Sequence, residues 1–199
     1  DVTAVMAGDG KMDPNDLIPV IKPVVSDRAD YTKGNRLFFG DAWNMIPHYR
    51  YLGNSTLSLL TKISSGYWHI ADSQSGYTAI CLMALKRIDP DLIYKDYGMP
   101  NDLLIRLNQY DFRVRDVHIK PVYNIGEESG IKLWKVIPTI STLLFRGFIK
   151  RLLIKYVIKD FHPLVLFYCL SMVTLPVSFL FFVRVWYVYF SRGFVPFTS

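Results

Sequence analysis

Along residues 1–130 the spacing of apolar side chains alternates between two periods. Apolar or alternating runs predict strands at 1–6, within 28–38 and at 112–123, and a strand that leads into a helix at 75–85. Apolar positions three or four residues apart predict a helix at 14–24. A polar and aromatic helical region is expected at about 41–64, and a capped helix at 100–110. Strands that alternate with helices are typical of a layered α/β domain.

The pattern changes after residue 130. From 131 to 160 apolar side chains recur at helical spacing, at Trp134, Ile137, Leu144, Phe148, Leu152 and Tyr156. The next segment, 163–183, is 21 residues long and has no charge. At about 1.5 Å per residue it spans a hydrocarbon core of about 30 Å, so we expect a transmembrane helix. The alternative is a buried helix of a soluble protein, which is usually shorter and has a polar face.

Charge is concentrated in the segment before this span. Residues 1–130 carry 14 Lys and Arg against 16 Asp and Glu, whereas residues 131–160 carry 7 basic groups and one acid. Next to an apolar span, such a segment favours an anionic membrane face over nucleic acid. We therefore expect an interfacial helix, with Arg151, Lys155 and Lys159 toward lipid head groups. The alternative is an ordinary helix packed on the domain.

The same charges predict the orientation of the chain. Five cations lie within about 20 residues before the span, and only Arg184 and Arg192 follow it, so the N-terminal domain is expected on the cytoplasmic face. Cys81 and Cys169 are too few and too far apart for a disulfide framework. The four histidines show no zinc-ligand spacing. Both observations fit a reducing compartment.

The first polar motif is the stretch AVMAGDGKMDP at 4–14. Asp9 lies there between two glycines, and Asp13 is placed to cap a helix that starts with Pro14. The apolar run at 1–6 has no start signal before it, so we expect a fragment that begins at a core strand. The chain contains no G-x-S-x-G, Walker or H-E-x-x-H motif, which argues against the enzyme classes that depend on them.

Three motifs follow one another before the basic helix and the span: MAGDGKMDP (6–14), ADYTKGNR (29–36) and ADSQSGY (71–77). Their order resembles the family 2 glycosyltransferases of GT-A fold, in the polyprenyl-phosphate, dolichol-phosphate mannose synthase-like branch. The resemblance covers nearly the whole chain. It implies the C-terminal part of a GT-A (Rossmann-like) catalytic domain at 1–130, an amphipathic juxtamembrane helix at 131–160, a transmembrane helix with an aromatic flank at 161–190, and a tail at 191–199.

The resemblance assigns the donor side of the site to the first motif. In the family a D-x-D binds the sugar-nucleotide diphosphate and a divalent cation, Mg²⁺ or Mn²⁺, and its second acid matches Asp9. Ala7 stands in place of the first acid, and Lys11 in place of a frequent Gln. One carboxylate is a poor ligand set for a hard cation. We therefore expect Asp9 to bind the diphosphate and to hold the cation only weakly, and Lys11 to offset diphosphate charge.

The resemblance assigns the acceptor side to the second motif. Gly34-Asn35-Arg36 matches the family's lipid-phosphate motif, which implies that Arg36 binds the acceptor phosphate. Arg50 with Ser55 is similar to a second Arg and Ser that complete this contact. A guanidinium suits phosphate because it donates two parallel hydrogen bonds. The alternatives are surface cations, or pairing with Asp27 and Asp30.

The third motif matches the family's acceptor-site turn. It makes Asp72 the candidate for the acidic residue beside the reacting sugar. Asp102 is a weaker candidate, and the alternative is that it caps a helix. A phosphate monoester is largely dianionic at pH 7, since its second pKa is about 6. Asp72 can then orient groups or stabilise positive charge, and an alcohol acceptor would need it as a general base.

The resemblance predicts a membrane-bound inverting glycosyltransferase. It would move a sugar from a nucleotide diphosphate onto a polyprenyl phosphate in the synthesis of a cell-envelope glycan. The family's nucleotide-base pocket precedes the D-x-D, so the chain alone is expected to be inactive. Two alternatives remain open: a non-catalytic, membrane-anchored binder of a sugar nucleotide or partner, which Ala7 and Lys11 favour, and transfer to a lipid or protein hydroxyl. The expected partners are the donor, the lipid acceptor and membrane lipids, and not nucleic acid.

Overall fold

The computed structural model describes residues 1–8, 10, 12–37, 48–120, 122, 133–159 and 161–192; side chains at 49, 50, 133–135 and 192 lie outside this description. The backbone forms two compact units, Asp1–Arg151 and Leu152–Ser199. The strands of the first unit are β1 Val2–Val5, β2 Tyr31–Asn35, β3 Thr78–Cys81 and β4 Val114–His118. Its helices are α1 Leu17–Val25, α3 His48–Ser65, α4 Leu82–Ile88, α5 Met99–Gln109 and α6 Leu133–Leu153, with short 3-10 turns η1 Pro14–Asp16 and η2 Pro90–Leu92.

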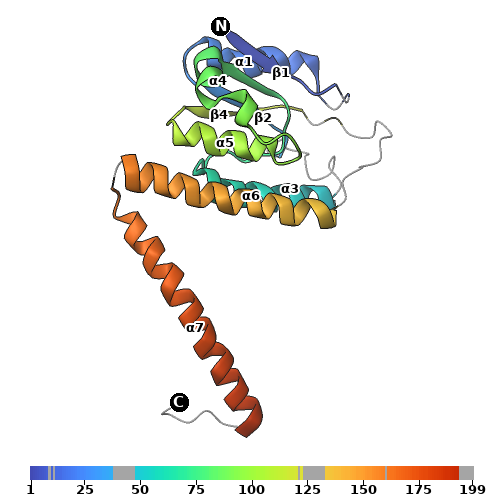
Figure 1. Ribbon diagram of the computed structural model, residues 1–199. Coiled ribbons are helices and arrows are strands. Elements are labelled where there is room, and N and C mark those ends of the chain that lie inside the picture. Colours follow the sequence, from blue (N-terminus) through green and yellow to red (C-terminus); the bar gives the residue numbers. More distant parts are fainter. Residues whose placement is uncertain are drawn as a thin grey trace. The chain divides into compact units, whose positions relative to one another are not determined.

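The four strands form one mixed sheet in the order β1-β3-β2-β4. Figure 1 shows α5 between this sheet and the helices α3 and α6. β3 runs antiparallel to both β1 and β2, whereas β2 and β4 are parallel. In the β2–β4 register Lys33 lies opposite Asp116. The predicted α/β class is thus confirmed. The expected core strand at 1–6 is β1, and it lies at an edge of the sheet that the described residues form.

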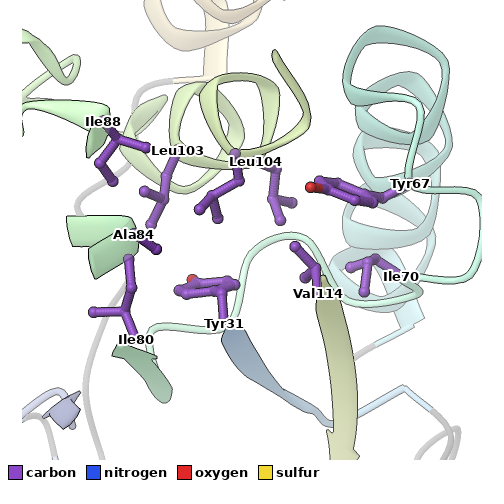
Figure 2. Packing of buried hydrophobic residues seen from close by; sticks show 10 residues of the cluster. Tyr31, Tyr67, Ile70, Ile80, Ala84, Ile88, Leu103, Leu104 and Val114 are labelled. Carbon is purple, nitrogen blue, oxygen red and sulfur yellow. The ribbon is translucent and has the colours of Figure 1, made fainter. Parts of the chain in front are cut away.

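Helices cover both faces of the sheet. On one face Val20 and Val24 of α1 pack with Tyr77 and Ala79. On the other face α4 and α5 close over Tyr31 and Val114, and Figure 2 shows Leu103 and Leu104 of α5 directed toward them. Full burial of each such apolar side chain contributes about 1.5–3 kcal/mol. These two cores fix the strand ends that carry the polar motifs.

A further layer of helices lies beyond α5. Ile105 of α5 packs with Ile140 and Leu144 of α6, and Leu57 of α3 packs against the same cluster. Arg151, which we predicted to face lipid head groups, is instead buried, and its Nη2 donates to the carbonyl of Ile63 at 3.0 Å. The prediction was wrong because a guanidinium at this position satisfies a carbonyl in the last turn of α3.

The predicted helix cap at Asp13 is confirmed. Its carboxylate accepts a hydrogen bond from the backbone N–H of Asn15 at 2.9 Å, and Pro14 opens the turn η1. The interaction satisfies one of the amide groups that a helix start leaves unpaired. Asp13 therefore has a structural role.

The second unit consists of helical segments. Residues Ile154–Lys159 form a π-helical segment (η3), and α7 spans Leu164–Arg192. Within α7, Leu164–Ser191 contains an 18-residue stretch with a mean hydropathy of 2.2, and it is the one helix among the described residues long and apolar enough to cross a membrane. The aromatic residues predicted for the interface continue the same helix, where Trp186 lies 5.2 Å from Phe190 between ring centroids. Pro176 lies inside this helix.

The C-terminal end of α3 gives a test of this packing. Gly66 has φ +80°, and a Cβ at this position would collide with the guanidinium of Arg151. We expect Gly66→Ala to lower the free energy of unfolding by about 1–3 kcal/mol. Gly53→Ala is the matched control, because it lies within α3 with no atom within 4 Å of the added Cβ, and it should be neutral or stabilising. Denaturant unfolding in detergent measures both; equal stability of the two variants contradicts this account.

Candidate functional site

Two of the predicted site residues are in direct contact. Asp72 accepts hydrogen bonds from Nε of Arg36 at 2.8 Å and from Nη2 at 3.2 Å. The backbone N–H of Arg36 also donates to Asp72, at 3.2 Å. Asp72 is fully buried, whereas the Arg36 side chain is 15% exposed. A bidentate, charge-assisted pair of this kind fixes both side chains.

The alternative partners considered for Arg36 are engaged elsewhere. Asp27 and Asp30 both pair with Arg113, at 2.6 and 2.9 Å. The hydrogen bond from Arg113 holds the pKa of Asp30 below its ordinary value, against the effect of burial. The alternative in which Arg36 pairs with these two acids is therefore not what the structure has; among the described residues its acidic partner is Asp72.

The Arg36 guanidinium keeps Asp72 ionised. Burial raises the pKa of Asp72, but the charge and hydrogen bonds of Arg36, together with the charge of Lys33, lower it by more, so that it lies below the ordinary 3.8. A carboxylate with a low pKa is a weak proton acceptor at neutral pH. The geometry therefore suits an orienting or charge-stabilising role better than general-base chemistry.

The loop that carries Asp72 is also held from the helix side. Ser58 of α3 accepts from the N–H of Ser73 at 3.0 Å, and the two hydroxyls lie 3.2 Å apart. The amide of Gln74 donates to Asn101 of α5 at 2.8 Å, and Thr61 of α3 donates to the same Asn101 oxygen at 2.9 Å. The buried polar side chains of α3 thus bind this loop directly or through Asn101.

Arg50 and Ser55 were predicted to complete the phosphate contact, and of these two Ser55 lines a pocket beside the same loop. A pocket of about 210 Å³ opens beside α3, lined by Leu37, Tyr51, Ser55, Ser58, Leu59, Lys62 and Ala71. Two residues of this lining, Leu37 and Ala71, are the chain neighbours of Arg36 and Asp72. The Arg50 side chain lies outside the described residues. The pocket lining combines hydroxyl groups, one ammonium and apolar side chains.

Asp102 has a different environment. Its carboxylate accepts from the N–H of Tyr94 at 3.0 Å and from Nε of Arg106 at 2.8 Å. Gly98 occupies the cap position of α5, so Asp102 lies in the first turn. These bonds tie the loop before α5 to the helix, and none of them involves Asp72 or Arg36.

Asp9 and Lys11, the predicted donor-side residues, lie outside the described residues. Their neighbours nevertheless lie beside the third motif. A Cβ on Gly76 would come within 3.5 Å of the Met12 side chain and 3.8 Å of Ala7. Gly10 has φ +71°, a conformation that favours glycine. In the part of the chain that the structure describes, no three His, Cys, Asp or Glu residues converge on a metal position.

The sequence did not point to two further charged residues at this site. Lys33 of β2 is fully buried, and its Nζ donates to the carbonyl of Ser75 at 2.5 Å. Asp116 of β4 accepts from the N–H of Ala71 at 2.7 Å and from the side-chain amide of Asn35 at 2.8 Å. The only available signal was a charged residue inside each predicted strand.

These features define a class of protein: a mixed α/β unit with a buried, charged polar site at the end of its sheet, followed by a helix of membrane-spanning composition. No protein-family model matches the chain. The chain is 31% identical over 123 residues to a UDP-N-acetylglucosamine–dolichyl-phosphate N-acetylglucosaminyltransferase of Methanococcus voltae. The aligned segment covers 62% of this chain and 49% of the relative.

A second relative is an uncharacterized protein of Methanocaldococcus jannaschii, 30% identical over 115 residues, which cover 58% of this chain and 47% of the relative. The chain thus spans about half the length of the curated relatives it matches. Its resemblance to glycosyltransferases that act on polyprenyl phosphates is confirmed by the first of them.

The Arg36–Asp72 pair gives a test of the site's electrostatics. Arg36→Met leaves a buried carboxylate without its cation, which should cost about 3–5 kcal/mol of folding free energy at pH 7. The pair contributes its full stability above pH 3.8 and loses it as the pH falls through the lower pKa of folded Asp72. The stability gap between Arg36→Met and wild type should therefore shrink in acid.

The control is the double variant Arg36→Met with Asp72→Asn, which removes both charges. It should be more stable at pH 7 than Arg36→Met alone. Urea unfolding in detergent between pH 3 and pH 7 measures these differences. A single variant that costs under about 1 kcal/mol at every pH would show that the pair is not coupled in this way.

Proposed function

We propose that this chain is a membrane-associated part of an inverting glycosyltransferase that moves a sugar from a nucleotide diphosphate to a polyprenyl phosphate. The observation that carries the proposal is the direct contact between Arg36 and Asp72, the two residues assigned to the acceptor phosphate and the reacting sugar. The similarity to a dolichyl-phosphate N-acetylglucosaminyltransferase supports the class of acceptor. In this proposal residues 1–130 belong to a GT-A catalytic domain.

The proposed reaction is a displacement at the anomeric carbon. An oxygen of the acceptor phosphate forms a bond to this carbon as the bond to the nucleoside diphosphate breaks, and the nucleoside diphosphate leaves. Because the acceptor is already largely dianionic at pH 7, it needs no base to attack. The ionised Asp72 is suited to stabilise the positive charge that develops on the sugar, and Arg36, with Ser55 and Arg50, is suited to bind the acceptor phosphate.

Asp9 and Lys11 complete the proposed donor side. The closeness of Ala7 and Met12 to Gly76 supports a position for this segment beside the Asp72 loop. Asp9 would bind Mg²⁺ or Mn²⁺, and the cation would neutralise charge on the leaving diphosphate. Since no ligand cluster exists among the described residues, this cation rests on Asp9 and the resemblance alone.

A membrane position for the first unit is supported by α3. This helix buries polar groups, among them Ser58 and Thr61, and exposes apolar ones. Its exposed apolar side chains are Leu52, Leu59, Leu60 and Ile63, each between 41% and 57% exposed. Helix α6 adds Ile137 and Phe145. Apolar faces of this kind lie in the head-group region of bilayers, where a polyprenyl phosphate presents its head.

The assay for the activity uses the protein expressed from its complete reading frame in proteoliposomes. Radiolabelled UDP-N-acetylglucosamine and other nucleotide sugars are supplied with dolichyl phosphate, with Mg²⁺, Mn²⁺ or chelator. We expect a lipid-soluble product that Asp72→Asn and Asp9→Asn reduce by at least about a hundredfold. Asp91→Asn, an exposed acid in η2, is the matched control and should retain activity.

The outcomes of this assay separate the candidate functions. Product formed with a lipid or protein alcohol, and not with the phosphate, would replace the proposed acceptor. Binding of a nucleotide sugar without any product would favour the non-catalytic relative that Ala7 and Lys11 suggest. An Asp72→Asn variant with wild-type turnover would contradict the role of the site.

The membrane face of α3 predicts a spectroscopic difference between two exposed leucines. Leu59→Cys on α3 is compared with Leu92→Cys in η2, which are 53% and 62% exposed in the wild type. Both are made with Cys81 and Cys169 replaced by serine and are labelled with an environment-sensitive dye. In liposomes the label at 59 should shift to shorter wavelength and be quenched by a lipid-bound quencher, and the label at 92 should not. Equal spectra would contradict the membrane position.

A further inference from the structure

Lys33 is a buried cation next to the site that the proposed reaction does not use. Lys33 projects from the centre of β2 into the interior, on the same side of the strand as Asn35. A buried ammonium is costly unless it is paired and hydrogen-bonded. Its partner, the carbonyl of Ser75 at 2.5 Å, belongs to the loop that carries Asp72.

Asp116 holds the other end of the same loop. Its Oδ2 accepts from the N–H of Ala71, the residue directly before Asp72, at 2.7 Å. The same oxygen accepts from the amide of Asn35 at 2.8 Å, and the carbonyl of that amide accepts from the N–H of Leu37 at 3.0 Å. Asp116 thus connects the backbone before Asp72 with the turn that carries Arg36.

Lys33 and Asp116 lie opposite each other in the parallel register of β2 and β4. The Oδ1 atom of Asp116 is buried without a hydrogen-bond partner among the described residues. The ammonium of Lys33 supplies attraction to both Asp116 and Asp72. A buried acceptor with no hydrogen bond is destabilising, so a nearby positive charge is needed to keep it in place.

We propose that Lys33 and Asp116 are positioning residues: they clamp residues 71–75 against the sheet and hold the ionised Asp72 carboxylate beside Arg36. Neither residue needs to touch the substrates. The proposal rests on the proposed role of Asp72 at the reacting sugar. It assigns to the sheet the task of placing the catalytic carboxylate, while α3 and α5 support the loop from the opposite side.

The charges around Lys33 give the clamp a pH dependence. Burial lowers the pKa of Lys33 to about 8; Asp72, from the loop, raises it, Arg36, at the end of β2, lowers it, and Asp116, from β4, raises it. Lys33 therefore loses its charge as the pH rises through about 8. In turn, loss of the Lys33 charge raises the pKa of Asp72, because that charge is one of the causes that lower it.

The test compares Lys33→Met with Lys86→Met, an exposed lysine of α4, in the full-length protein. Lys33→Met should lower kcat by about ten- to a hundredfold while the KM for the nucleotide sugar stays within about twofold. The acidic limb of its kcat profile should move to higher pH, and the alkaline limb near pH 8 should disappear. Lys86→Met should match the wild type in kcat, in KM and in both limbs of the pH profile. Thermal melting establishes that each variant is folded.

A second variant covers the case in which Lys33→Met does not fold. Asp116→Asn keeps the shape of the side chain but removes a charge that raises the pKa of Lys33, so the alkaline limb should move to lower pH. A wild-type kcat and pH profile in either folded variant overturns the proposal.

Carbon-13 NMR of labelled aspartate, assigned with Asp72→Asn, provides a readout without turnover. The pKa of Asp72 should rise in Lys33→Met and stay constant in Lys86→Met; an unchanged titration in Lys33→Met overturns the proposal. If the wild-type protein makes no product with any donor, the proposed function fails, and this titration still decides whether Lys33 controls Asp72.

Discussion

The structure of the site depends on charges buried at one end of a sheet. Asp72 and Lys33 have essentially no solvent contact, and Arg36 is mostly buried beside them. Taking such groups out of water costs several kcal/mol each, and only close partners offset this. The strands β2 and β4 and the loop at 71–75 must therefore keep a fixed relative position, or the charges lose their partners. This requirement links the fold to the chemistry.

The same requirement explains the unusual composition of α3. A helix in a soluble domain normally buries its apolar side, but α3 turns Ser58 and Thr61 inward because the loop beside it needs donors and acceptors. Its apolar side chains are then left on the outside. In water this arrangement would be unfavourable, whereas at a bilayer surface it is favourable. The inward polar side chains of α3 thus bind the loop of the site, while its outward apolar side chains suit a bilayer surface.

The alternation of periods in the sequence was sufficient to predict the elements that frame the site. The strand at 28–38, the strand that leads into a helix at 75–85 and the helix at 100–110 correspond to β2, β3 with α4, and α5. The cap at Asp13 followed from local chemistry. Arg36 and Asp72 were found through their motifs, although their mutual contact was not predicted, because it joins residues 36 apart through the tertiary fold.

Other parts of the site could not be predicted for a physical reason. Lys33 and Asp116 are 83 positions apart, and only the parallel pairing of β2 with β4 makes them neighbours. A strand pattern tells which residues share a face, but not whether that face meets solvent, a helix or a loop. Arg151 shows the same limit, because a cation on an amphipathic helix was assigned to lipid head groups when a carbonyl at the end of α3 binds it.

The low pKa of Asp72 connects this electrostatic arrangement with the choice of acceptor. An enzyme that activates an alcohol needs a base with a pKa near the working pH, and a carboxylate tied to Arg36 is far from that range. An acceptor that arrives as a dianion needs no base, but it does need cations and a carboxylate that stays ionised beside the sugar. The Arg36 guanidinium lowers the pKa of the carboxylate, and the neighbouring Leu37 lines a pocket that contains hydroxyl groups. In the proposed reaction, this electrostatic arrangement favours a phosphate acceptor over a hydroxyl acceptor.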